Sequence, residues 1–125
     1  MEWKKFFDGL ATEAALAPDL AAKRYAWEWR GNTFHIQSKP DNRFYMEFTL
    51  SASGYMTVTL AGYCKLVSYK IQLHPGDESD EFLQGNIIAA TKMLWRVGSE
   101  AGAQQLWHAF NETFQPETLW LEPDE

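Results

Sequence analysis

The chain has 125 residues and a mass of 14.4 kDa, the size of one domain. Hydrophobic residues make up 46% and charged residues 22%, which excludes a disordered chain. The single cysteine, Cys64, excludes an intramolecular disulfide framework and a zinc site with several thiolates. No apolar run reaches the roughly 18 residues of a membrane span, so we expect no membrane partner. Lys4 and Lys5 precede only two apolar residues, so we expect no signal peptide and a cytoplasmic location.

The net charge of −6 is distributed unevenly along the chain. Residues 21–70 carry seven basic and three acidic side chains, whereas residues 71–125 carry two basic and ten acidic ones. We expect a polarised surface that steers partners of opposite sign, although the same charges would also keep a protein soluble. Neither segment is basic enough for a protein that binds duplex DNA.

Residues 2–16 are predicted to form an amphipathic helix that Pro18 ends, because Trp3, Phe6, Phe7 and Leu10 recur at helical spacing. From residue 25 the apolar residues alternate with polar ones, as in a strand, and Gly31-Asn32 is typical of a two-residue hairpin turn. This turn sets a register in which both apolar stripes share one face. The predicted pairs are Trp29 with Phe34, Trp27 with Ile36, and Glu28 with His35.

Alternation predicts three further strands, at residues 44–50, 55–61 and 66–73. The second hairpin needs a three-residue loop with Gly54 in the left-handed conformation, because a four-residue loop would mix the two faces. We expect this bulged loop to pair Phe48 with Met56. A tight turn near residues 62–65 connects the last two strands.

Two helices follow the strands. In the first helix the apolar stripe expected to face the core consists of Leu83, Ile87, Ala90, Leu94 and Val97, and the stripe is widened by Phe82, Ile88, Thr91 and Trp95. In the second helix the stripe consists of Ala103, Leu106, Trp107, Phe110 and Phe114. Gly98 ends the first helix and Ser99 caps the second. Residues 119–121 are too apolar to stay free, so we expect them to dock.

These elements predict one α+β domain over residues 1–125, with residues 117–125 as a short acidic tail. It has an N-terminal helix, a five-stranded antiparallel meander sheet and two C-terminal helices packed on one sheet face. The opposite face would carry Glu28, Arg30, His35, Gln37, Tyr45, Glu47, Tyr55, Thr57, Thr59 and Lys70. A glutamate beside His35 suits proton transfer, but cross-strand polar pairs are ordinary sheet stabilisers and an open face excludes no water.

Other candidate sites have simpler explanations. His74 and the acids at 77–81 contain metal-ligand types without the spacing of a calcium loop, and carboxylates at a helix N-terminus are typical of interaction with the helix dipole. Cys64 lies beside Lys65 without a nearby histidine, and His108 is expected at the surface. The tryptophans are expected in the core, although a pocket for an aromatic ligand could be lined by Trp27, Trp29, Tyr69, Trp95 and Phe110. No phosphate-binding or dinucleotide fingerprint occurs, so we expect no metal and no cofactor.

We therefore expect a non-enzymatic binding protein of the inhibitor, immunity or adaptor type that covers a partner protein with a basic surface. The predicted partner-binding residues are Asp77, Glu78, Asp80, Glu81, Tyr45 and Tyr55. The alternative is a domain that binds a nucleotide or aromatic metabolite through Arg30, His35, Arg43 and Lys70. A third possibility is a homodimer formed through the sheet edge or residues 119–121.

Overall fold

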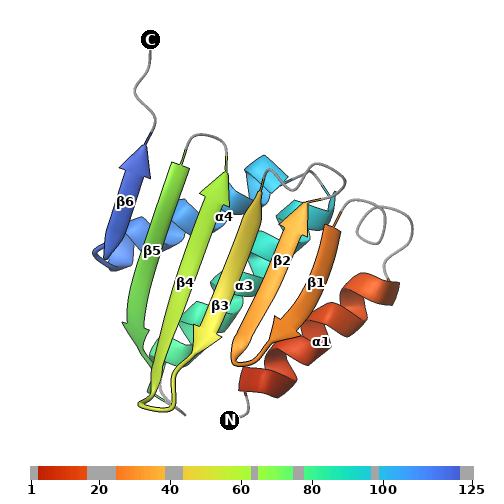
Figure 1. Cartoon of the computed structure of the whole chain (residues 1–125), viewed down its shortest axis with the longest axis horizontal. Coiled ribbons are helices and arrows are strands. Elements are labelled where there is room, and N and C mark those ends of the chain that lie inside the picture. The colour runs from red at the N-terminus through yellow and green to blue at the C-terminus, as the bar shows by residue number, and fades with distance from the viewer. Residues whose placement is uncertain are drawn as a thin grey trace.

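A computed structural model of the chain describes residues 3–16, 25–38, 44–62, 65–74, 78–96 and 99–121. These residues form one antiparallel sheet of six strands in sequential order, with the helices packed on one of its faces (Figure 1). The expectations for Pro18, Arg43, Cys64, Asp77, Val97 and Gly98, the turn at 63–64 and the loop at 75–77 lie outside the described residues.

The predicted α+β fold is confirmed. The helices are α1 (Trp3–Leu16), α3 (Glu78–Arg96) and α4 (Ser99–Thr113), and the strands are β1 (Tyr25–Arg30), β2 (Thr33–Ser38), β3 (Tyr45–Leu50), β4 (Tyr55–Gly62), β5 (Lys65–Gln72) and β6 (Thr118–Leu121). The segment expected to dock forms β6, a sixth strand antiparallel to β5 that begins the predicted acidic tail.

The hairpin of β1 and β2 has the predicted register. Trp29 lies opposite Phe34, Trp27 opposite Ile36 and Glu28 opposite His35, and Gly31 has a φ of 62°. A left-handed residue matches the turn to the twist of the strands, and glycine adopts that conformation without a steric cost.

The hairpin of β3 and β4 has the predicted loop but a different register. Gly54 has a φ of 88°, its N–H donates to the Ser51 carbonyl at 3.2 Å, and the Ser51 N–H donates to the Tyr55 carbonyl at 2.8 Å. These bonds close the three-residue bulged loop that we expected. The expected pairing of Phe48 with Met56 is wrong, because Phe48 lies opposite Val58. A shift of two residues leaves the apolar face unchanged.

The core lies between the sheet and the three helices. Its largest fully buried side chains include Phe7 of α1, Phe48 of β3, Tyr69 of β5 and Phe110 of α4. The predicted inward residues of β2 to β5 that are buried are Phe34, Ile36, Met46, Phe48, Met56, Val58, Leu60, Val67, Tyr69 and Ile71, and Phe44, just before β3, is buried as well. Phe82 differs from expectation: it is 39% exposed and touches Phe114 at the margin of the core.

Tyr69 is the polar exception inside this core. Its ring packs edge-on against Phe110, and its hydroxyl has no hydrogen-bond partner among the described residues. Burial removes the hydroxyl from water and raises its pKa above the ordinary value of 10.0. A buried donor without a partner costs about 1–3 kcal/mol, so this hydroxyl lowers the stability of the fold.

Replacement of Tyr69 by phenylalanine is expected to raise the free energy of unfolding by about 1 kcal/mol at neutral pH. The folded-state pKa is the higher one, so the unfolded chain loses this proton first as the pH rises. The contribution of Tyr69 to the free energy of unfolding is therefore constant below about pH 10 and falls above it. Tyr69→Phe has no ionisable group at this position, so it lacks this part of the pH dependence. Urea unfolding of both proteins at pH 7 and pH 11 measures the difference. A less stable Tyr69→Phe at pH 7 would show that the hydroxyl is satisfied.

Candidate functional site

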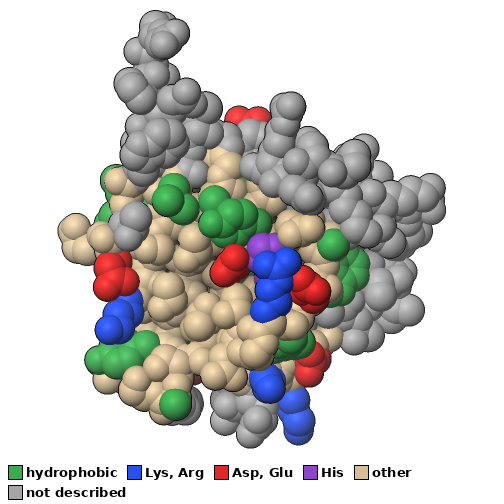
Figure 2. Space-filling model, viewed as in Figure 1, with side chains coloured by type: hydrophobic (Ala, Val, Ile, Leu, Met, Phe, Trp, Pro, Cys, Tyr) green, Lys and Arg blue, Asp and Glu red, His purple; other side chains and the backbone are tan. Residues whose placement is uncertain are grey.

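No described element covers the face of the sheet opposite the helices, and this face carries the candidate site. Figure 2 shows this face as largely uncharged, with one histidine near its middle flanked by basic and acidic side chains. The strand registers order its side chains in two rows that cross five strands: Arg30, Thr33, Thr49, Thr57 and Lys70 in one, and Glu28, His35, Glu47, Thr59 and Ser68 in the other.

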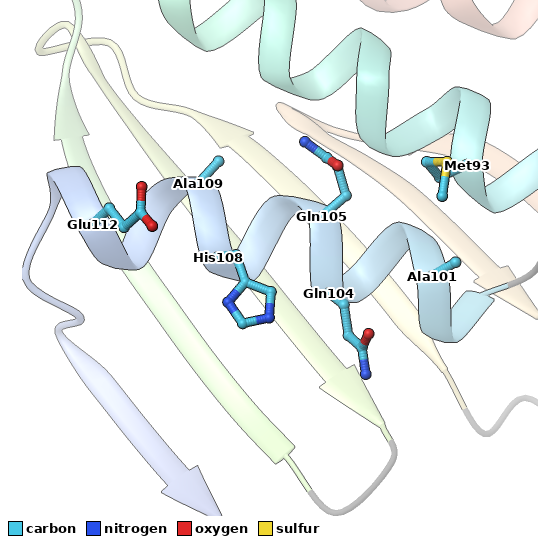
Figure 3. Close-up of a pocket in the computed structure, with 7 residues that line it drawn as sticks. All are labelled: Met93, Ala101, Gln104, Gln105, His108, Ala109 and Glu112. Carbon is cyan, nitrogen blue, oxygen red and sulfur yellow. The ribbon is translucent and has the colours of Figure 1, made fainter.

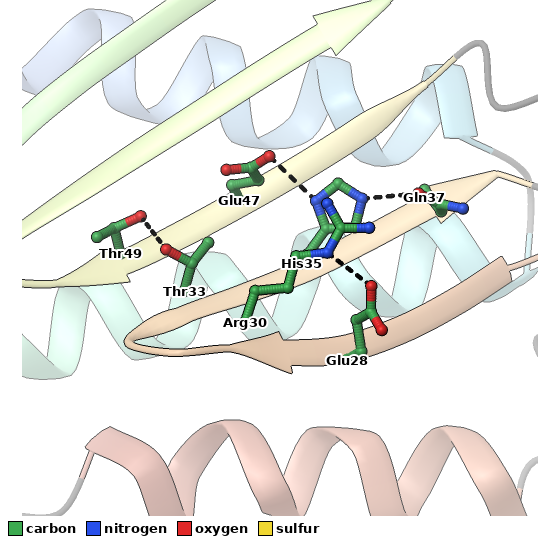
Figure 4. A network of polar contacts seen from close by, with 7 residues as sticks. All are labelled: Glu28, Arg30, Thr33, His35, Gln37, Glu47 and Thr49. Carbon is green, nitrogen blue, oxygen red and sulfur yellow. Dashed lines mark hydrogen bonds and ion pairs between the residues drawn. The ribbon is translucent and has the colours of Figure 1, made fainter.

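His35 is the most unusual residue of this face. Its side chain lies on the uncovered side of the sheet, yet only 5% of the residue is exposed. Nδ1 lies 3.1 Å from Glu47 Oε1 and Nε2 lies 2.8 Å from Gln37 Oε1 (Figure 4). The Tyr45 ring stacks on the imidazole, with 5.5 Å between the ring centres. Neighbouring side chains of the sheet therefore bury the imidazole, and none of the described helices contributes to this burial.

Arg30 and Glu28 complete this arrangement, which we call the histidine cluster (Glu28, Arg30, His35, Gln37, Tyr45 and Glu47). Arg30 Nε donates to Glu28 Oε1 at 2.6 Å, and both side chains are more than half exposed. In Figure 4 the guanidinium end of Arg30 extends from β1 toward the His35 ring. The cluster thus has a fixed, buried centre and a charged, solvent-facing rim.

The hydrogen bonds decide what the histidine can do. The Glu47 carboxylate only accepts, so Nδ1 carries a hydrogen, while Nε2 either donates to the Gln37 oxygen or accepts from its amide nitrogen. Both ring nitrogens are engaged within the cluster. A general base needs a ring nitrogen within reach of the substrate proton, so this geometry suits a rigid contact surface better than proton transfer.

The two predicted partner-binding tyrosines lie far apart. Tyr45 belongs to the histidine cluster, whereas Tyr55 begins β4 with the Lys70 ammonium 4.7 Å from its ring centre. Tyr45 lies opposite Ala61, six residues along β4 from Tyr55, which corresponds to about 20 Å along the strand. One compact partner-binding site cannot centre on both residues.

The predicted acidic residues also separate. Glu78 and Glu81 are exposed in the first turn of α3, but Asp80 is only 4% exposed. Asp80 accepts hydrogen bonds from Trp3 Nε1 at 3.3 Å and from the His74 backbone N–H at 3.0 Å. Asp80 therefore joins the start of α1 to the start of α3 and is not presented to a partner. Asp77 lies outside the described residues.

The residues of the small-ligand alternative do not converge. Arg30 and His35 are neighbours, but Lys70 lies on β5, four strands from β1, at a distance of about 19 Å. Arg43 lies outside the described residues. The indole N–H of Trp29 donates to Asp8 Oδ1 at 2.9 Å, whereas a ligand pocket would leave such a group without a protein partner. The described residues therefore bring together only part of the set that a small anion or aromatic ligand would need.

A second surface feature lies on the helical side. A groove of about 450 Å³ lies along α4, where Met93 of α3 forms one side, and the α4 residues that line it are Ala101, Gln104, Gln105, His108, Ala109 and Glu112 (Figure 3). His108 is exposed there, as expected. Sequence periodicity assigns each residue to a helix face but gives no relative placement of two helices, so the groove was not predicted.

Further observations bear on the class of protein. Among the described residues, no three histidine, cysteine or acidic side chains are grouped closely enough to hold a metal ion. None of the described helices is both long enough and apolar enough to cross a membrane. Comparison with known proteins finds no matching family model, no matching curated protein and no matching solved structure. The histidine cluster on the open sheet face is therefore the best-defined candidate site among the described residues.

Proposed function

We propose that this chain is a non-enzymatic binding protein of the inhibitor, immunity or adaptor type, which covers part of a partner protein with the open face of its sheet. The contact surface centres on the histidine cluster over β1, β2 and β3. The proposal includes a cytoplasmic location, supported by the single cysteine in the sequence.

The observation that carries this proposal is the burial of His35 on a sheet face that no described helix covers. A cross-strand polar pair stabilises a sheet by about 0.2–1 kcal/mol. Such a pair does not require an imidazole that is buried and hydrogen-bonded at both ring nitrogens. In a contact surface, however, fixed side chains lose little conformational entropy on binding, so they contribute more to affinity than mobile ones. Tyrosine and arginine, which frame His35, are residue types enriched in binding hot spots.

The charge of the chain indicates the kind of partner. The net charge is −6, and Glu78, Glu81, Glu100 and Glu112 are exposed acidic residues of the helical layer. The histidine cluster itself is nearly balanced, because Glu28 pairs with Arg30 and Glu47 bonds to His35. The acidic chain would attract a basic protein over a distance, while the cluster would provide the specific contacts. Association should then slow as the salt concentration rises.

The test is a matched pair of double variants. Tagged protein is purified gently from its source cells, the complex is identified by native mass spectrometry, and the affinity of the purified partner is measured. We expect Arg30→Ala with Tyr45→Ala to weaken binding by about 100-fold, because each residue is a candidate hot spot. The control, Lys70→Ala with Tyr55→Ala, removes a similar pair at the other end of the same face and should change binding by less than about threefold.

Two outcomes would contradict the proposal. If the control pair weakens binding and the cluster pair does not, the contact surface lies elsewhere. If the tagged protein is recovered only as a 14.4 kDa monomer, it has no stable partner of the proposed kind. Far-ultraviolet circular dichroism and urea unfolding of both double variants verify that each one is folded.

A further inference from the structure

β6 is an edge of the sheet. It pairs with β5 on one side, and no other described element lies beside its other side (Figure 1). An edge strand presents unpaired backbone N–H and C=O groups, which are the groups that another strand recognises. The chemistry of this edge therefore specifies an extended segment as its partner.

The ladder shows which backbone groups of β6 face outward. The Leu73 N–H donates to the Gly54 carbonyl at 2.9 Å, so the backbone of Leu73 faces β4. Backbone groups alternate along a strand, and the register of β5 is continuous, so those of Ser68 and Leu66 face β6. Their partners are Thr118 and Trp120. The N–H and C=O of Leu119 must then face away from the sheet.

The strand at this edge carries neither of the side-chain types that usually discourage pairing. Natural edge strands are protected by being short, by charges or proline, or by a covering element, and β6 has only its shortness. β6 has the sequence TLWL, and Leu119 is the most exposed of the large hydrophobic residues that the structure describes, at 48%. The opposite edge, β1, differs: it carries Glu28 and Arg30, and α1 lies beside it, with Asp8 bonded to Trp29.

We propose that β6 pairs with β6 of a second copy of this chain in antiparallel orientation, across a two-fold axis perpendicular to the sheet at Leu119. Leu119 of each copy exchanges both backbone hydrogen bonds with Leu119 of the other, because these groups face outward on the edge. Thr118 then lies opposite Trp120 of the second copy. This inference stands independently of the proposed function.

A second copy can pair with this edge in full register. Directly opposed residues of an antiparallel pair must lie on the same face of the sheet, and a perpendicular two-fold axis through Leu119 satisfies this condition for every pair. The arrangement uses the same edge twice and leaves no free β6 edge, so it closes as a dimer. A head-to-tail pairing of β6 with β1 would form open fibres, and α1 and the charges of β1 oppose it.

The contact is small, and its strength should respond to salt in a characteristic way. Four residues of one strand bury much less than the roughly 1,000 Å² of a stable interface. We therefore expect a weak dimer with a dissociation constant on the order of 100 µM. Both copies carry a net charge of −6 and repel each other, so salt should strengthen the dimer. A basic partner of the proposed kind would show the opposite dependence, which separates the two proposals.

Analytical ultracentrifugation from about 5 to about 500 µM protein tests the dimer. We expect the mass to rise from 14.4 kDa toward twice that value. Leu119→Lys should keep the chain monomeric by placing a charge at the two-fold axis. Leu119→Pro should do the same by removing the outward N–H, without loss of a bond between β5 and β6. Met93→Lys, a similar change at a residue exposed on α3, is the control and should dimerise like the parent chain.

Amide hydrogen exchange identifies the surface directly. The Leu119 N–H should exchange rapidly in dilute protein and become protected as the concentration rises, whereas the Trp120 N–H should be protected throughout by its bond to β5. A parent chain that stays monomeric at about 500 µM refutes the dimer. So does a dimer that tolerates both Leu119 variants, one that Met93→Lys abolishes, or one that salt dissociates. Binding of another protein to β6 without self-association would also overturn it.

Discussion

Replacement of Gly102 by alanine is expected to lower the free energy of unfolding by about 2–3 kcal/mol, because it overpacks the contact between α3 and α4. A Cβ atom at this position would lie 2.7 Å from Leu94 Cβ and 2.9 Å from the Ala90 carbonyl oxygen. Neither neighbour is the flexible end of a side chain. The helices would have to move apart, and this motion would disturb the buried side chains of Leu94 and Leu106 beneath them.

Gly85 provides the matched control for this substitution. It is an exposed glycine in the middle of α3, and no heavy atom of the described residues would lie within 4 Å of its Cβ. Gly85→Ala should therefore raise the free energy of unfolding by about 0.5–1 kcal/mol through helix propensity alone. Urea unfolding monitored by circular dichroism measures both variants. Equal effects of the same sign would show that the two helices do not approach closely at Gly102.

Replacement of Phe7 by alanine is expected to cost still more, about 3–5 kcal/mol, because it leaves a large cavity at the centre of an aromatic cluster. Phe7 is fully buried. Its ring lies 5.0 Å from that of Phe48 and 5.2 Å from that of Phe34, and it also contacts Trp3, Phe6 and Trp29. This one side chain joins α1 to three strands, so the variant should lose the packing of α1 first.

Two measurements distinguish local from global damage in Phe7→Ala. Hydrogen exchange should accelerate in α1 before it accelerates in β4, which is remote from the substituted ring. Phe82→Ala, at a phenylalanine 39% exposed on α3, is the control and should cost no more than about 1 kcal/mol. A Phe7→Ala chain as stable as the Phe82→Ala chain would show that α1 contributes little to the core.

The sequence predicts best where the structure is local. The register of the first hairpin follows from Gly31-Asn32, since a two-residue turn determines all the pairs beyond it. The three-residue loop at Gly54 was also predicted, but the partner of Phe48 was displaced by two residues, because alternation cannot distinguish registers that share a face. The docking of residues 119–121 was predicted, but not that the segment docks as a sixth strand beside β5. Four residues carry too little periodicity to indicate a strand.

The site was harder to predict than the fold, because its contacts join distant residues and depend on rotamers. The sequence placed His35 opposite Glu28 on the open face and placed Glu47 on the same face. The histidine bonds to Glu47 and Gln37 instead, and Glu28 bonds to Arg30. Asp80 was expected at the surface with other acids, but Trp3, 77 residues away, covers it and donates to it. Local sequence patterns therefore predict neither the hydrogen-bond partners of His35 nor the burial of Asp80.

The order of strands in the sheet also determines the order in which the chain can fold during synthesis. Neighbouring strands from β1 to β5 are consecutive in sequence, so each hairpin closes a short loop and can form as it leaves the ribosome. β6 is different, because the whole of α3 and α4 separates it from β5. At about 5–20 residues per second, several seconds pass before β6 is made. During that interval the nascent chain has an open β5 edge, and the completion of β6 is the step that removes it.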